Sequence, residues 1–312
     1  MRAAVIAGGL SHERDVSLRS GRRVSDALRR AGNQVEVWDG DLALIDRVKS
    51  SSTDAAFVAL HGGAGENGGV QTLLELAGMP FVGSRSTACR VAYDKAVAKT
   101  ELREHALPTP DWVALPSAVF RDFGAAAVGE LILDRIGLPL VVKPALGGSA
   151  LGVRAVHRRE DLPPALVEAY SFGGEALVER YVGGLEVTVP VLHLDGEYVC
   201  LRPVLIDAAG DYDYQARYDA SSGVRYEHLE DEDGRVDVPA LKELAVAVHE
   251  ALGLRHLSRV DLRLDSAGAL QVLEAAVTPG MTETSVWPLA VHAAGLELGA
   301  VLTGLLREAA GT

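Results

Sequence analysis

Over the first 84 residues, short apolar runs alternate with stretches that have a helical spacing of apolar positions. Residues 3–6 and 55–60 are almost wholly apolar, as expected of strands covered on both faces, and residues 34–38 alternate between polar and apolar. Apolar residues recur at helical spacing over 70–77. Strands that alternate with helices predict a doubly wound, Rossmann-like parallel sheet, so we expect an N-terminal subdomain over 1–84.

A second, smaller unit follows over residues 85–183. Its pattern predicts one helix over 86–105 and strands over 139–143 and 176–181. A glycine-rich loop at 147–152 interrupts the strands. We expect a small central α+β subdomain.

The third unit covers residues 184–312 and again mixes strands with helices. A strand over 186–192 precedes a polar segment at about 207–233 that is rich in Tyr and Asp. A loop of that length is typical of a functional lid. Pro239 then begins a clear amphipathic helix. The pattern predicts a C-terminal α+β subdomain with a lid loop, and an α/β fold class for the whole chain.

A predicted hairpin near the C-terminus brings acidic and basic side chains together. The strand that begins at Arg259 alternates polar and apolar residues, and 265–268 has the composition of a turn. A four-residue loop would place Arg259 opposite Glu274 and Asp261 opposite Val272. Two carboxylates without a thiolate or an imidazole suit Mg²⁺ bound together with phosphates. A cross-strand ion pair on a solvated face would explain the same residues.

The glycine-rich loop at 147–152 is a candidate phosphate site. Its backbone N–H groups could close over phosphate oxygens, and Lys143 just before it could neutralise their charge. It is not a Walker A loop, because no Gly-Lys-Ser/Thr begins a helix there. An ordinary glycine-rich hairpin is the alternative.

Two further candidates follow the first and third predicted strands. Glu13 and His61 lie in the loops 8–17 and 61–68, and ligands of open α/β sheets bind outside the carboxyl ends of the strands. Both side chains could therefore face one crevice. The structural alternatives are a helix N-terminal carboxylate and an ordinary loop histidine.

Composition narrows the functional class. The net charge of -13 argues against general nucleic-acid binding, which needs a basic face. Two cysteines in 312 residues suit a reducing compartment better than a disulfide scaffold. The first apolar run, 3–7, is too short for a signal peptide or a membrane span, so we expect a cytoplasmic protein with no membrane partner.

Seven sequence runs, in this order, resemble the D-alanine–D-alanine ligases of the ATP-grasp superfamily almost from end to end. These runs are 8–21, 61–69 with Gln71, 93–95, 142–144, 212–218, 259–261 and 279–282. The resemblance implies three subdomains, with ATP between the second and the third. It also implies ATP and Mg²⁺ (one or two ions, with Mn²⁺ possible), D-alanine as substrate, a role in peptidoglycan synthesis, and a homodimer.

In the reaction that the resemblance implies, ATP phosphorylates the carboxylate of the first D-alanine to give an acyl phosphate. The amine of the second D-alanine then attacks the carbonyl carbon, and phosphate leaves from a tetrahedral intermediate. Such chemistry depends on positioning and charge neutralisation rather than on a covalent protein intermediate.

The resemblance assigns these roles residue by residue. The residues expected to bind ATP are Lys95, Lys143, Gly148, Ser149, Glu179, Val182, Glu186 and Arg217, of which Glu179, Val182 and Glu186 would read adenine and ribose. The residues expected to bind Mg²⁺ are Asp261 and Glu274. The expected catalytic residues are Glu13, Ser149, Tyr218, Arg259 and Gly280. The expected substrate residues are Glu13, His61, Arg259, Gly280 and Ser285.

Within the catalytic set, each residue has an implied task. Glu13 would anchor the ammonium group of the first D-alanine. Ser149 and Tyr218 would link through hydrogen bonds and lock the lid. Arg259 and the Gly280 N–H would stabilise the developing oxyanion.

The sequence departs from the family pattern at several positions. Ala276 stands where the family has an asparagine ligand for a second metal ion. Other departures are Asn67 for an acid, Ala150 for a serine, Arg217 for a lysine, and Val286-Trp287 near the second substrate. Three functions therefore stay open: a D-alanine–D-alanine ligase, a ligase of the same mechanism with another amino-acid acceptor, and a nucleotide-binding relative with impaired catalysis.

Overall fold

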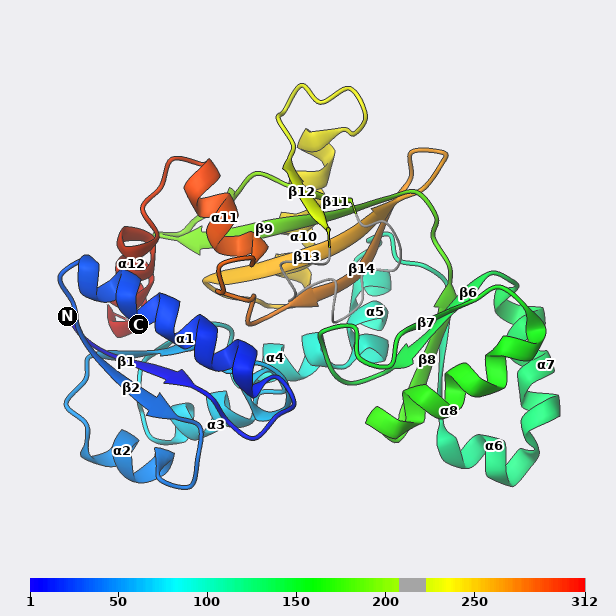
Figure 1. Cartoon of the computed structure of the whole chain (residues 1–312), viewed down its shortest axis with the longest axis horizontal. Coiled ribbons are helices and arrows are strands. Elements are labelled where there is room, and N and C mark those ends of the chain that lie inside the picture. The colour runs from blue at the N-terminus through cyan, green and yellow to red at the C-terminus, as the bar shows by residue number, and fades with distance from the viewer. Residues whose placement is uncertain (208–222, 312) are drawn as a thin grey trace.

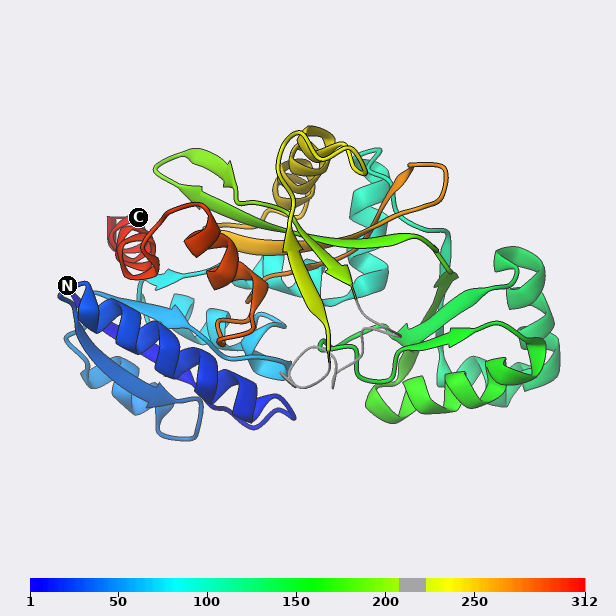
Figure 2. The same ribbon diagram turned by 45° about the horizontal axis from the view of Figure 1, so that its top comes forward.

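Three β-sheets, one for each predicted unit, form the framework of the protein (Figure 1). The computed structural model describes residues 1–207 and 223–311. The N-terminal and central units lie at opposite ends of the molecule, and the largest sheet lies between them (Figure 1 and Figure 2). One parallel and two antiparallel sheets with helices against them confirm the predicted α/β class.

The N-terminal sheet is parallel, with the strand order β2-β1-β3-β4. Its elements, with the C-terminal helix that joins them, are β1 (Arg2–Ala7), α1 (Arg14–Arg30), β2 (Gln34–Asp39), α2 (Leu44–Ser50), β3 (Ala55–Val58), the 3-10 helix η1 (Gly63–Gly65), α3 (Gly69–Leu76), β4 (Phe81–Val82) and α12 (Leu298–Gly311). The central strands β1 and β3 are buried on both faces, which is why they are nearly all apolar. Helices α1 and α12 contact each other and share one core with this sheet, so the chain ends pack together.

The central sheet is antiparallel, with the order β5-β8-β6-β7. Its elements are β5 (Trp112–Pro116), α6 (Ser117–Phe123), α7 (Ala125–Ile136), β6 (Leu140–Pro144), β7 (Arg154–Val156), the 3-10 helix η2 (Arg159–Asp161), α8 (Leu162–Phe172) and β8 (Glu175–Arg180). Apolar residues of α7 and α8 pack against β6 and β8 in a separate small core. The other face of this sheet is left for the functional site.

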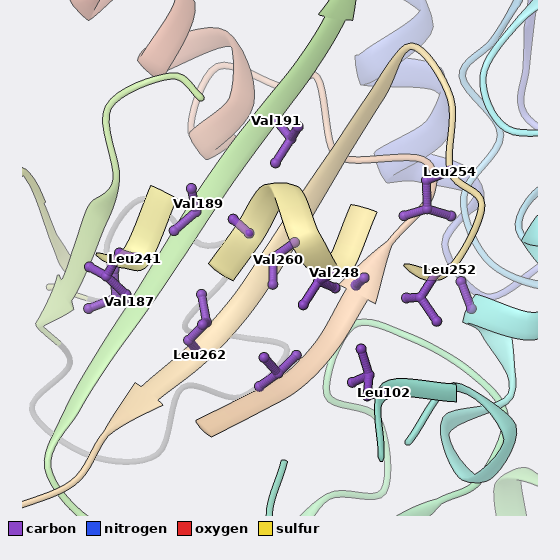
Figure 3. Packing of buried hydrophobic residues seen from close by; sticks show 14 of the residues in the cluster. Leu102, Val187, Val189, Val191, Leu241, Val248, Leu252, Leu254, Val260 and Leu262 are labelled. Atoms are coloured by element: carbon purple, nitrogen blue, oxygen red, sulfur yellow. The ribbon is translucent and has the colours of Figure 1, made fainter. Parts of the chain in front are cut away.

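The C-terminal sheet has six antiparallel strands in the order β12-β11-β9-β13-β14, with β10 paired to β9. Its elements are β9 (Leu185–Leu194), β10 (Glu197–Cys200), β11 (Val204–Asp207), β12 (Arg225–His228), α10 (Val238–Ala251), β13 (Leu257–Leu264), β14 (Leu270–Ala276) and α11 (Val286–Ala293). Alternate valines of β9 face the apolar side of α10, as the period-2 and period-3.6 patterns require (Figure 3). This packing leaves the opposite face of β9, β13 and β14 for polar side chains.

The predicted single helix over 86–105 is wrong. The structure has two helices, α4 (Ser86–Tyr93) and α5 (Lys95–Glu104), because Asp94 leaves the helical conformation and caps α5. Its carboxylate accepts hydrogen bonds from the N–H groups of Ala96 and Val97. Both helices share the core of the six-stranded sheet, including Leu102 of α5 (Figure 3). α5 also contacts the central sheet through Lys99 and Glu179, so it joins the central and C-terminal units.

The predicted register of the 259–274 hairpin is also wrong. Asp261 pairs with Glu274 and Arg259 pairs with Ala276. The pairing of Leu264 with Leu270 leaves a loop one residue longer than expected, and an irregularity between Asp261 and Leu262 adds one more residue to β14. Because two residues are added and side chains alternate along a strand, Glu274 stays on the predicted face of the sheet, and both acids still project toward the same site.

The predicted lid segment is not irregular throughout, because β12 lies within it and pairs with β11. Residues 208–222 lie outside the described residues. Among the helices that are described, no single one is long and apolar enough to cross a membrane, and one bent pair, α11 with α12, passes that test only when taken together.

Candidate active site

A cleft of about 1070 Å³, its open mouth included, lies between the central sheet and the six-stranded sheet. Its walls come from β6, β7 and β8 on one side and from β9, β13 and β14 on the other. Of the residues proposed for ATP and metal, those that line it are Lys95, Lys143, Gly148, Glu179, Val182, Glu186, Asp261 and Glu274. Its mixed apolar and charged lining suits a ligand with a flat apolar part and a charged part.

On the central wall, a carboxylate is held between two ammonium groups. Glu179 of β8 lies 2.6 Å from Lys143 Nζ through Oε1 and 2.9 Å from Lys99 Nζ through Oε2. Burial opposes its charge, but the two lysines hold the pKa of Glu179 below its usual value. Burial of the Lys99 ammonium group lowers its own pKa to about 8. The side chain of Glu179 is therefore held between the two lysines by ion pairs.

Lys95 closes one end of the cleft. Its Nζ donates to the Gly147 carbonyl at 2.5 Å and lies 3.4 Å from Glu274 Oε2. Its position follows from the break at Asp94, since Lys95 is the first residue of α5. A lysine, the glycine-rich loop and an acid of β14 thus meet at one point.

On the opposite wall, Asp261 is held within its own sheet. Arg259, two residues earlier on β13, donates to both of its carboxylate oxygens at 2.8 and 2.7 Å. The Thr188 hydroxyl of the paired strand β9 donates to Oδ1 at 2.7 Å. This strand alternation puts an arginine and an acid on one face, as the sequence pattern indicated.

Glu186 and Val182 lie where the chain passes from the central unit into the six-stranded sheet. Glu186 of β9 is paired with Arg263 of β13, whose Nη2 donates to Glu186 Oε2 at 2.6 Å. Val182 lies in the connection between β8 and β9 and lines the cleft.

A second group of predicted residues gathers at the N-terminal unit. Ser149 donates to Glu13 Oε1 at 3.2 Å, and this bond joins the glycine-rich loop to the loop after β1. Ser149 reaches it from a left-handed backbone conformation, φ 56°, which is uncommon for a residue with a side chain. His61 lies beside this pair and makes a 2.8 Å contact from Nε2 to the Ser20 hydroxyl.

The carboxylate of Glu13 is buried and closely confined. Burial and the nearby Glu66 raise the pKa of Glu13, while hydrogen bonds from Ser149 and Ser11 and the charge of His61 oppose that shift. A Cβ on Gly62 would come within 1.8 Å of Glu13 Oε2, so any side chain there would displace the carboxylate, and the left-handed φ of 67° disfavours one as well. Sequence reasoning missed Glu66, which lies 3.7 Å from His61 Nδ1; its place inside the matched run 61–69 was the available signal.

The third group surrounds a smaller pocket of about 450 Å³, its mouth included. Arg259, Gly280 and Ser285 line it, together with Asp261, which therefore faces both cavities. The Ser285 hydroxyl accepts from the Thr282 N–H at 2.9 Å and holds the loop in place. Trp287 contributes to the wall, but its ring is fully buried in the core and its N–H points to the Val191 carbonyl at 3.4 Å.

Tyr218 and Arg217, predicted for the lid and for ATP, lie outside the described residues. The remaining predicted residues fall into three adjoining groups that share Asp261 and the loop carrying Gly148 and Ser149.

The residues at the cleft fit a magnesium ion. Asp261 and Glu274 are direct cross-strand neighbours, and they offer carboxylate oxygens without a sulfur or imidazole ligand. Among the described residues, no group of three or more His, Cys, Asp or Glu side chains is arranged to hold a metal ion. Two protein carboxylates with waters and phosphate oxygens are the usual magnesium shell, so two acids are enough.

Comparisons with known proteins point to one family. The families described as D-ala D-ala ligase N-terminus and C-terminus match residues 44–84 and 102–307. The chain is 37% identical over 309 residues to the D-alanine–D-alanine ligase of Pelotomaculum thermopropionicum, covering 99% of this chain and 96% of that protein. It is 39% identical over 308 residues to the enzyme of Syntrophotalea carbinolica, with the same coverage.

Solved ligase structures superpose on nearly the whole chain. The D-alanine–D-alanine ligase of Bacillus anthracis complexed with ATP superposes with a TM-score of 0.82 at 29% identity, covering 99% of this chain and 97% of that one. The VanG D-Ala:D-Ser ligase of Enterococcus faecalis superposes with a TM-score of 0.83 at 26% identity, covering 99% of both chains.

Proposed function

The chain belongs to the D-alanine–D-alanine ligase family, and from this premise we propose how its three groups of residues divide the ATP-dependent joining of two D-alanines. The observation that carries the proposal is the cleft between the two antiparallel sheets, with two lysines and two acids converging on it. It would hold ATP, with Lys95, Lys143 and the glycine-rich loop at the phosphates. The base and ribose would lie along the main chain of 179–182 and at Glu186.

Glu13, with His61 and Ser149 beside it, would bind the first D-alanine. The Glu13 carboxylate would accept the substrate ammonium group, and its burial makes that ion pair strong because little water competes. The substrate carboxylate would then point toward the phosphate end of the cleft, since Ser149 belongs to the same loop as Gly148. One carboxylate oxygen would attack the γ-phosphorus, the bond to ADP would break, and an acyl phosphate would form.

The smaller pocket would receive the second D-alanine. Ser285 would help to bind its carboxylate, and its amine would attack the acyl carbon. Arg259 and Gly280 line that pocket, and the guanidinium group and the Gly280 N–H would stabilise the negative oxygen of the tetrahedral intermediate until phosphate leaves. Mg²⁺ held by Asp261 and Glu274 would neutralise charge on the phosphates. The product, D-alanyl-D-alanine, serves peptidoglycan synthesis, and we place the reaction in the cytoplasm and expect a homodimer.

The test is a product assay with purified protein, ATP and Mg²⁺. With D-alanine alone, we expect one phosphate released for each D-alanyl-D-alanine detected by mass spectrometry. A parallel reaction with D-alanine and D-serine shows whether the second pocket admits the larger acceptor. A mixed dipeptide formed where D-alanine alone gives none would assign another acceptor. If ATP binds but no D-amino acid causes phosphate release, the chain is a nucleotide-binding protein without ligase activity.

A further inference from the structure

Lys99 is a buried lysine close to the cleft that no motif singled out. It follows Lys95 by one turn of α5, so both side chains leave the same face of the helix. Lys95 reaches the cleft, whereas Lys99 is 1% exposed and lies behind Glu179. A buried ammonium group needs a reason, because desolvation of a charge is expensive unless partners compensate it.

The partners of Lys99 come from different units of the fold. Its Nζ lies 2.9 Å from Glu179 Oε2 of the central sheet and donates to the Thr109 hydroxyl at 2.6 Å. Thr109 in turn donates to the Val272 carbonyl of β14 at 2.8 Å. Glu179 completes the series through its 2.6 Å contact with Lys143 Nζ. An unbroken polar chain therefore runs from β14, two residues before Glu274, to Lys143.

The charges along this chain do not cancel. Two buried ammonium groups share one carboxylate, so the cluster carries an excess of one positive charge. Lys143 lines the cleft, so the excess faces the place where phosphates would lie. Lys143 alone would balance the charge of Glu179, so charge balance does not require the second ammonium group. Its charge makes sense if Glu179 must stay ionised and fixed while Lys143 also contacts a phosphate.

We propose that Lys99 is a positioning residue for the phosphate end of the nucleotide site. It holds the Glu179 carboxylate, which in turn holds the Lys143 ammonium group at the cleft, and Thr109 ties this arrangement to the strand that carries Glu274. The proposal rests on the proposed ATP site. It concerns the phosphates and not the base, because Lys99 acts through Lys143.

The experiment compares ATP with adenosine, which lacks the phosphates. Dissociation constants of both are measured by calorimetry for the wild type, Lys99→Met and the control Lys242→Met, whose side chain is 27% exposed and pairs with Asp231. For Lys99→Met we expect ATP to bind about tenfold more weakly, the size of one charge-assisted contact, with adenosine unchanged. Equal weakening of both ligands, or of neither, would overturn the proposal.

If Lys99→Met does not fold, Thr109→Val decides. It keeps every charge and removes the hydroxyl that accepts from Lys99 and donates to the Val272 carbonyl, so we expect roughly threefold weaker ATP binding and unchanged adenosine binding. If the ratio of ATP affinity to adenosine affinity is the same in Thr109→Val as in the wild type, the proposed role of Lys99 is refuted. A wild-type protein that binds adenosine as tightly as ATP would instead refute the proposed phosphate site itself.

Discussion

The two walls of the cleft neutralise their buried acids in different ways. Glu179, on the central wall, is 3% exposed and is held by lysines from α5 and β6. Asp261, on the opposite wall, has two partners in its own sheet, Arg259 and Thr188. The Arg259 side chain is 19% exposed, and in the proposed function it would turn toward substrate when a metal ion takes the carboxylate oxygens. The first acid is part of the framework that joins units; in the proposed function, the second would exchange its arginine for a metal ion.

Glu274 provides the sharpest test of the proposed metal ligands on the six-stranded sheet. It pairs with Asp261 across the strands, and its Oε2 lies 3.4 Å from Lys95 Nζ. In the proposed function, a metal ion would take the place of this lysine contact. Glu274→Gln removes one oxygen ligand while keeping the shape, so we expect turnover to fall about a thousandfold, as when a preorganised electrostatic group is lost. Phosphate release at saturating ATP and Mg²⁺ measures this. Glu197→Gln, an exposed acid on β10, is the control.

Near-wild-type turnover by Glu274→Gln would contradict the assignment of Asp261 and Glu274 as the metal ligands. Normal folding of the variant, checked by circular dichroism, is needed for either result to count.

The framework role of Glu179 predicts a loss of stability that is present even without ligand. Glu179→Gln leaves two buried ammonium groups without their carboxylate, and breaking one partner of a buried pair costs about 3 kcal/mol. Asp261→Asn keeps an acceptor for Thr188 and frees a partly exposed arginine, so we expect about 1 kcal/mol. Urea unfolding of both variants without ligand measures the difference. Equal losses would show that the two walls do not differ in the way described.

Local patterns were enough to predict the framework of the molecule. Continuous apolar runs identified β1 and β3, and alternation from Arg259 onward placed an arginine and an acid on one face. These features could be predicted because they depend on which side of a strand is buried. Motif resemblance then supplied the three groups of the candidate site.

Features that depend on three-dimensional packing could not be predicted in the same way. The extra loop residue and the irregularity in β14 changed the partner of Asp261 without changing the apolar pattern, so periodicity carried no trace of them. Lys99 and Glu179 are 80 positions apart, and only the approach of α5 to β8 brings them together. The break at Asp94 had a local signal in its capping side chain, which the helical spacing on both sides obscured.

The smallest expected effect concerns Ala276, which pairs with Arg259 at the end of β14. It lies two residues from Glu274 on the same strand, so its side chain projects to the same face as the proposed metal ligands. Ala276→Asn would add one carbonyl oxygen there, and one neutral ligand is worth about 1 kcal/mol, or a fewfold lower Mg²⁺ concentration for half-maximal turnover. A Mg²⁺ titration of ligase activity measures the shift, and Ala276→Leu, of similar size without the oxygen, is the control. If the two variants respond alike, residue 276 lies near the metal site without contributing a ligand, and Asp261 and Glu274 are the proposed oxygen ligands that remain.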